Sequence, residues 1–218
     1  MASYTMPVPV IPLFGDAASS LPILIQFMYA TTMKNGEFQS TTTGNILLQL
    51  KPFRFFKAFF HRMLFELLVL SSQQVGSDWA SILKKRESYR TAFFDFDPER
   101  VAAINEKQKH IISVEHGMDI NRVQGIVDNA NRILEVMEAY MSFDTYIWGF
   151  VNNKAISTRY RFGIKIPVKT SKSECISRDM VRRGFRFVGP TAVHSFMQAA
   201  GLTNDHLVTC HRHGQFGG

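Results

Sequence analysis

The sequence has few cysteines and no long apolar run, and both shortages limit what the protein can be. Only Cys175 and Cys210 occur among 218 residues, so no disulfide framework can hold the chain together, and a reducing compartment is expected. The apolar run from Leu21 to Ala30 is interrupted by Gln26 and is far shorter than the roughly 20 residues that a membrane-spanning helix needs. With 45% hydrophobic and 20% charged residues, the composition is that of a folded globular protein without a membrane partner.

Acidic residues are scarce in one segment of the chain. The sequence holds 25 Lys and Arg against 18 Asp and Glu. Between Lys154 and Arg186 there are ten basic residues and only two acids, Glu174 and Asp179, so that segment carries +8 and the rest −1. The alternative is an ordinary solvated charged face, but such faces usually mix residues of both signs. A stretch of one sign favours contact with phosphate and makes nucleic acid, or an anionic membrane surface, the first partner to test.

The first 62 residues differ from the rest of the chain. Up to residue 50 the only charges are Asp16, Lys34 and Glu37, and we expect this divergent segment to be partly disordered. No basic region precedes its apolar run, which argues against a secretory signal. The lack of acids at the start is compatible with an organellar transit peptide, but early arginines are missing. A nuclear location is therefore expected, with an organelle as the alternative.

Helical signals dominate from residue 53 onward, and strand-like alternation is scarce. Residues 53–70 place Arg54, Lys57 and His61 at helical spacing among phenylalanines, which predicts an amphipathic helix in the core rather than on a membrane surface. We expect an all-α domain over residues 63–218. Further helices are predicted after the N-cap residues Ser77 and Asp97, the latter followed by Pro98, over residues 123–137 and around residues 146–150, with an irregular loop over residues 152–170.

Two helices joined by a short turn are predicted between residues 171 and 201. Ser171 and Glu174 match a capping box that begins the first helix, and Gly184 is suited to end it. Pro190 suits the first turn of the second helix. Free N–H groups at a helix start bind anions, so a DNA phosphate is expected here, and a ligand-free αα-hairpin is the alternative. The predicted DNA contacts are Arg182, Arg183, Gly184, Phe185, Arg186, Val188, Gly189 and Thr191.

Four blocks of the sequence resemble the DNA-3-methyladenine glycosylase I family. They read LFELLVLSSQQVGSDWASILKKRESYR from Leu64, FDPERVAAINE from Phe96, YIWGFVN from Tyr146 and VRRGFRFVGPTAVHSFMQAAGLTNDH from Val181. Residues 71–79 are most similar to plant members. The resemblance implies the fold of the helix-hairpin-helix DNA glycosylases, which are all-helical proteins that hydrolyse the N-glycosidic bond of damaged bases in the first step of base excision repair. A monomer acting on double-stranded DNA with alkylated bases is expected.

The implied reaction needs few catalytic groups and no cofactor. Methylation at N3 gives adenine a positive charge and makes it a good leaving group, so the enzyme has to extrude the nucleotide, hold the base and admit water. Trp79 stands at the family's base-stacking position, and an aromatic face attracts a desolvated cation by about 1–2 kcal/mol. Without the surrounding block, this tryptophan would be interpreted as a core residue. Gln73 and Gln74 are expected to contact the base, with a surface position as the alternative.

One departure from the family concerns the acid that contacts the base. In the bacterial members that this segment resembles, a glutamate stands at the position of Ser71, whereas plant-like members are expected to have a serine. A serine can donate or accept a hydrogen bond but supplies no negative charge. Ser71 is therefore expected to act beside Trp79, with discrimination of the cationic base depending more on Trp79 and on shape.

A second departure concerns metal. His206 and Cys210 are four residues apart, the spacing of two zinc ligands on one face of a helix. In the family a cysteine and a histidine near the N-terminus complete this site, but here no cysteine precedes Cys175, and His61 lies too close to the Leu64 block. We expect only a half-site for structural zinc. The local alternative is that residues 211–213 supply substitutes.

Three interpretations of the whole chain follow. The leading one is an active alkylpurine DNA glycosylase. The second is a DNA-binding relative that has lost catalysis together with the N-terminal wall of its pocket. The third is an altered splice form or mistaken translation, in which the first 63 residues are joined to a family body and leave the fold incomplete.

Overall fold

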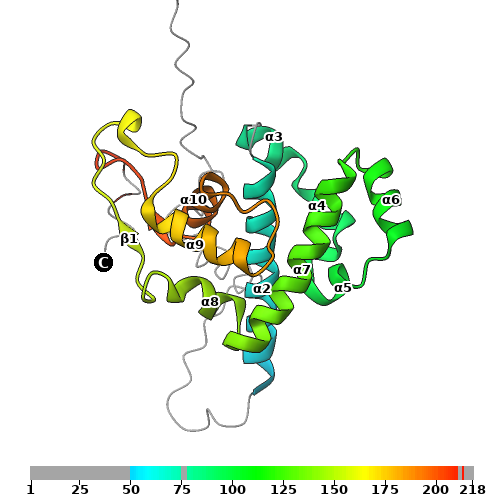
Figure 1. The fold of residues 1–218 in the computed structure, drawn as a ribbon. Helices are drawn as coiled ribbons and strands as arrows, with labels where there is room; N and C mark the ends of the chain where they lie inside the picture. Colours follow the sequence, from blue (N-terminus) through cyan, green and yellow to red (C-terminus); the bar gives the residue numbers. More distant parts are fainter. Residues whose placement is uncertain (1–49, 75–77, 211–212, 214–218) are drawn as a thin grey trace, which may run out of the picture.

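The computed structural model describes residues 50–74, 78–210 and 213, with side chains from His61 onward. These residues form a mostly helical body, which confirms the predicted all-α class (Figure 1). Two short 3-10 helices, η3 and η4, and one pair of two-residue strands accompany the α-helices. In chain order the elements are α2 (Leu50–Gln73), α3 (Trp79–Lys84), α4 (Arg86–Ala92), η3 (Phe94–Phe96), α5 (Pro98–Ala102), α6 (Glu106–Glu115), α7 (Ile120–Tyr140), α8 (Phe143–Gly149), β1 (Ile156–Ser157), η4 (Gly163–Lys165), α9 (Ser171–Arg182), α10 (Pro190–Ala199) and β2 (Thr203–Asn204).

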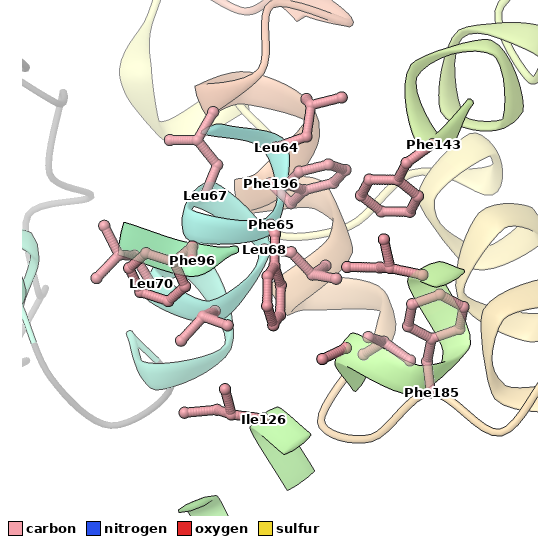
Figure 2. Close-up of a cluster of buried hydrophobic side chains, with 14 of the residues drawn as sticks. Leu64, Phe65, Leu67, Leu68, Leu70, Phe96, Ile126, Phe143, Phe185 and Phe196 are labelled. Atoms are coloured by element: carbon pink, nitrogen blue, oxygen red, sulfur yellow. The ribbon is translucent and has the colours of Figure 1, made fainter. Parts of the chain in front are cut away.

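Helix α2 lies at the centre of the body and packs against α10, α8, α7, α5 and η3 (Figure 1). Every residue from Met63 to Ser72 is buried. Figure 2 shows Leu64 of α2 near Phe196 of α10 and Phe143 of α8. The predicted core helix is therefore confirmed, and it begins at Leu50, a little before the predicted residue 53.

The predicted helix starts are partly confirmed. The Asp97 carboxylate accepts hydrogen bonds from the first amides of α5, and Pro98 occupies the first helical position, as expected. For α3 the N-cap is Asp78 rather than Ser77, which lies outside the described residues. An aspartate binds helix-end amides as well as a serine does, so two adjacent candidates could not be separated by sequence. The single helix expected after residue 77 also breaks at Lys85 into α3 and α4.

The capping box of α9 is displaced by one residue from the prediction. Thr170 is the N-cap, and its hydroxyl and that of Ser173 bond reciprocally to each other's backbone amides. Glu174 instead forms an ion pair with Lys169 at 2.8 Å. The predicted pair, Ser171 and Glu174, was wrong because Thr170, one residue earlier, offers the same kind of cap.

The loop predicted over residues 152–170 is mostly irregular, as expected, but it contains η4 and strand β1. β1 pairs in parallel with β2, with Ile156 opposite Thr203. This pairing joins the loop to the segment after α10. Helix α2 runs without a break across residues 62 and 63, where the N-terminal segment was expected to end. In the part of the chain that the structure describes, no helix is long and apolar enough to cross a membrane.

Candidate functional site

The C-terminal turn of α2 carries two buried polar atoms that lack a partner. Ser71 is 1% exposed, and neither its Oγ nor the Nε2 of Gln73 has a hydrogen-bond partner among the described residues. Gln74 is engaged, since its Oε1 accepts a hydrogen bond from Ser195 of α10 at 3.2 Å. Buried polar groups in proteins are nearly always paired, so unpaired ones need an explanation. A ligand with donors and acceptors of its own would supply the missing partners.

Trp79 lies at the first position of α3, just beyond this turn. Its side chain is buried and belongs to the hydrophobic core cluster. The burial agrees with either interpretation of this tryptophan, as a core residue or as one wall of a base pocket. The neighbouring cap fixes its backbone, because the Asp78 carboxylate accepts from the Ser81 amide at 2.9 Å.

A buried carboxylate anchors the segment that carries Trp79. Glu66 of α2 is 4% exposed and accepts hydrogen bonds from Arg86 Nε at 2.5 Å and from Arg90 Nε at 2.9 Å. Both arginines belong to α4, so the beginning of α4 is fixed on α2 directly after α3. Breaking a buried ion pair on one side leaves an uncompensated charge. This network therefore restricts how far Trp79 can move from the end of α2.

A second candidate site is the hairpin, residues 184–189, between α9 and α10. Gly184 has φ +89° and ends α9 as predicted: its amide bonds to the Val181 carbonyl, and the Phe185 amide bonds to the Met180 carbonyl. This is the Schellman pattern, in which the left-handed position favours glycine. Phe185 and Val188 are both buried. These two apolar side chains therefore hold the hairpin against the core.

The start of α10 presents unused backbone donors. Among the described residues, none accepts a hydrogen bond from the amides of Val188, Gly189 or Thr191. Gly189 and Thr191 are exposed, and Pro190 occupies the first helical position as predicted. Exposed amides at the positive end of a helix dipole favour an anion. Gly189 has φ −59° and open space around its Cα, so the fold itself does not require glycine there.

The three arginines beside the hairpin have different surroundings. Arg182 and Arg186 are exposed, with 67% of the Arg186 side chain accessible. Arg183 instead binds Asp179 at 2.7 Å and lies over the rings of Tyr140 and Tyr146. Arg182 and Arg186 are thus the two that are exposed to a ligand, and Arg186 Nε also lies 3.5 Å from the Asp128 carboxylate of α7.

The contacts of Asp179 shift its protonation equilibrium. Burial alone would raise the pKa of Asp179, but hydrogen bonds from Arg183 and from the Tyr146 hydroxyl outweigh it and hold that pKa below its ordinary value. Burial and the same hydrogen bond raise the pKa of Tyr146. Asp179 therefore stays ionised and keeps Arg183 directed toward α8.

Sequence reasoning missed the residues of α7 that hold the hairpin. Asn129 is 1% exposed, and its side-chain amide bonds to both the N–H and the carbonyl of Arg186. Gly125 lies against the Phe187 ring so closely that a Cβ on it would be 2.3 Å from a ring carbon. A buried asparagine and a glycine within an otherwise apolar helical stripe were the available signals.

His206 and Cys210 lie in a turn after β2, not on a helix as predicted. Helix α10 ends at Ala199, and the pairing of residues 203 and 204 with β1 separates it from His206. Cys210 Sγ and His206 Nδ1 are 3.9 Å apart, but among the described residues no three potential ligands gather. His213 is directed elsewhere, with its Nε2 at 2.7 Å from the Thr158 carbonyl. His211, another of the proposed substitutes, lies outside the described residues, and the two donors that the structure describes do not complete a four-coordinate zinc site.

Comparison with known proteins shows to which family the chain belongs. A family model described as methyladenine glycosylase matches residues 58–213. The chain is 40% identical over 151 residues to DNA-3-methyladenine glycosylase 1 of Escherichia coli, which covers 68% of this chain and 81% of that protein. It is 38% identical over 149 residues to DNA-3-methyladenine glycosylase of Haemophilus influenzae, covering 67% and 80% respectively. The structure of 3-methyladenine DNA glycosylase I from Staphylococcus aureus is similar with a TM-score of 0.67 at 34% identity, over 70% of this chain and 82% of that one. This chain belongs to the methyladenine glycosylase family.

Proposed function

We propose that this protein is a DNA glycosylase that hydrolyses the N-glycosidic bond of 3-methyladenine in DNA and so begins base excision repair. Its similarity to glycosylases of that name over most of their length supports the reaction. The observation that carries the proposal is the buried hydroxyl of Ser71 in the last turn of α2, which has no hydrogen-bond partner among the described residues and precedes Trp79 by eight positions. Buried polar groups are nearly always paired, so a base with donors and acceptors of its own is a suitable partner for this hydroxyl.

The base is held by few groups because its own charge activates it. A cationic leaving group departs without strong acid catalysis, so the protein has to stack the base, satisfy its polar edge and admit water. Trp79 supplies an aromatic face, and Ser71 Oγ and Gln73 Nε2 supply hydrogen-bonding atoms that have no partner in the part of the chain the structure describes. Ser71 cannot neutralise the base as a carboxylate would, so selectivity for the cation depends on the tryptophan ring.

The DNA backbone is held by α9, the hairpin and α10, which act together as a helix-hairpin-helix unit. The exposed amides of Gly189 and Thr191 receive one phosphate, and Arg182 and Arg186 add positive charge beside it. Such contacts position the protein but do not read sequence. The partner is thus double-stranded DNA carrying an alkylated base.

The proposal is tested by incubating the protein with alkylated duplex DNA and separating the released bases by chromatography. Wild-type protein is expected to release 3-methyladenine, and Trp79→Phe to release it more slowly while still binding undamaged duplex. Trp148→Phe is the matched control, because Trp148 is the other tryptophan and is half-buried on α8. If the folded wild-type protein binds DNA but releases no methylated base, it is instead a DNA-binding relative that has lost catalysis.

A further inference from the structure

Three residues on one face of α7 contact the hairpin. Arg122, Gly125 and Asn129 are three and four residues apart, which places them on the same side of the helix. Asn129 bonds to the backbone of Arg186, and Gly125 admits the ring of Phe187. The guanidinium of Arg122 lies 4.3 Å from the centroid of that same ring. The hairpin is therefore seated on α7 along three successive contacts.

Phe187 is held in a conformation that needs such support. Its φ is +57°, in the left-handed region that a phenylalanine rarely adopts. The ring is wedged between Gly125 on one side and the Arg122 guanidinium on the other. Since 38% of the residue is still exposed, burial alone does not hold it there. The stack on Arg122 and the contact with Gly125 therefore hold this ring against α7.

Arg122 also reaches the end of α2. Its Nη1 donates to the carbonyl of Ser72 at 3.2 Å. Ser72 stands between Ser71 and Gln73, whose Oγ and Nε2 are the unpaired buried atoms. A cation at the carbonyl end of a helix is favourable, and among the described residues no carboxylate lies within ion-pair distance of Arg122. One guanidinium therefore touches both the hairpin and the turn that carries the unpaired atoms.

We propose that Arg122 is a positioning residue that fixes the hairpin relative to the end of α2. It thereby keeps the phosphate site and the base site at the separation that one DNA strand requires. The inference rests on the proposed function. In DNA the phosphates and the extruded base are joined covalently, so a protein that holds both must keep its two sites at a set separation. A misplacement of about 1 Å can cost roughly 100-fold in rate. Arg122 is suited to this task because a planar guanidinium can stack and donate at the same time.

The test substitutes Arg122→Lys, which keeps the positive charge but loses the planar group that stacks and donates. Three quantities are measured: duplex affinity at fixed salt, affinity for free 3-methyladenine, and the single-turnover rate of excision from duplex DNA. We expect both affinities to change by less than about two-fold and excision to fall between roughly 10- and 100-fold. Phe187→Leu, which removes the stack from the other side, should give the same pattern, and the double variant should be no slower than the worse single one.

Arg100→Lys is the matched control. Arg100 lies 4.3 Å from the centroid of the Phe94 ring, so it has the same stacking geometry but no contact with the hairpin. Its excision rate should equal that of wild type. Thermal unfolding of each variant establishes that it is folded.

Four outcomes would overturn the inference. Excision within two-fold of wild type in folded Arg122→Lys and Phe187→Leu would remove any positioning role. If duplex affinity fell in proportion to excision, Arg122 would be a phosphate contact. If affinity for the free base fell in proportion to excision, Arg122 would only stabilise the base site at the end of α2. A wild-type protein that releases no base would reject the proposed function and this inference together, whereas the first three outcomes leave the function intact.

Discussion

Asn129 forms two hydrogen bonds with the backbone of Arg186: its Oδ1 accepts from the amide at 2.7 Å, and its Nδ2 donates to the carbonyl at 3.0 Å. A buried side chain on α7 thus satisfies both polar groups of an exposed hairpin residue. The side chain of Arg186 is 67% exposed, and its Nε lies 3.5 Å from Asp128 Oδ2 on the same helix α7. The hairpin owes its shape to α7 as much as to its own glycine.

Replacing Asn129 by alanine is expected to loosen the hairpin. Two hydrogen bonds are lost, and the backbone N–H and carbonyl of Arg186 lose the partner that Asn129 provides, so the free energy of unfolding should fall by about 1–3 kcal/mol. Affinity for duplex DNA should fall as well, because the hairpin amides are no longer prearranged. Urea denaturation and DNA titration measure the two effects. Asn131→Ala is the control, since Asn131 bonds only to the Val127 carbonyl of its own helix and should cost less than about 1 kcal/mol.

The arginines beside the hairpin should differ in how their loss affects DNA binding and stability. Arg186→Ala is expected to weaken DNA binding and to reduce the slope of log affinity against log salt by about one unit, as for a lost phosphate contact. Arg183→Ala should leave that slope nearly unchanged and lower the melting temperature, because Arg183 is bound to Asp179 and stacked on tyrosines. Titrations at several salt concentrations give the slopes. Equal loss of slope in both variants would contradict this division.

Ser71 and its neighbour Ser72 provide a matched pair. Ser71→Ala removes a buried hydroxyl that has no partner, so it should leave stability unchanged or raise it by up to about 1 kcal/mol, while excision falls. Ser72→Ala removes a hydroxyl that donates to the Val69 carbonyl at 2.7 Å, so it should cost about 1 kcal/mol and leave excision intact. Thermal unfolding and base release are measured on both. A Ser71→Ala protein with wild-type excision would mean that the unpaired hydroxyl does not face the base.

The fold was largely predictable because its signals are local. Asp97 followed by Pro98, and Gly184 after an amphipathic stretch, determine helix ends through their own backbone chemistry. The contacts that hold the candidate site in place were not predictable in the same way. Asn129 meets Arg186, and Arg122 meets Ser72, across separations of 57 and 50 residues, and no local pattern records which distant backbone group a polar side chain will bind. For the same reason Arg183 could be recognised as basic but not as internally paired.

Asp179 and Asp144 should respond to pH with opposite sign. The pKa of Asp179 is lowered in the fold, chiefly by hydrogen bonds from Arg183 and Tyr146 that overcome its burial, so its ionised form stabilises the protein above the ordinary pKa of an aspartate. That contribution is lost as the pH falls through the lowered pKa. Burial raises the pKa of Asp144, so its ionised form is destabilising at neutral pH, and protonation relieves this as the pH falls through the raised pKa.

Two variants separate these effects. At pH 7, Asp179→Asn should lower the free energy of unfolding by about 1–3 kcal/mol, and its difference from wild type should shrink below about pH 4, where the unfolded carboxylate protonates. Asp144→Asn should be neutral or stabilising at pH 7 and should converge on wild type at a higher pH than Asp179→Asn does. Urea unfolding from pH 7 to pH 3 measures both. A difference for Asp179→Asn that stayed constant over this range would rule out its ionisation as the cause.

The two glycines of the hairpin should respond differently to alanine. Gly184 has φ +89°, where any side chain is strained, so Gly184→Ala should lower the free energy of unfolding by about 1–2 kcal/mol. Gly189 has φ −59° and no atom within 4 Å of an added Cβ. Gly189→Ala should therefore leave stability unchanged or raise it by about 0.4–1 kcal/mol, because alanine restricts the unfolded chain. Duplex affinity should nevertheless fall, since the new methyl group would stand beside exposed amides that we propose receive a phosphate. Denaturation and DNA titration test the pair, and a Gly189→Ala protein that binds DNA as wild type does would mean that the phosphate approaches elsewhere.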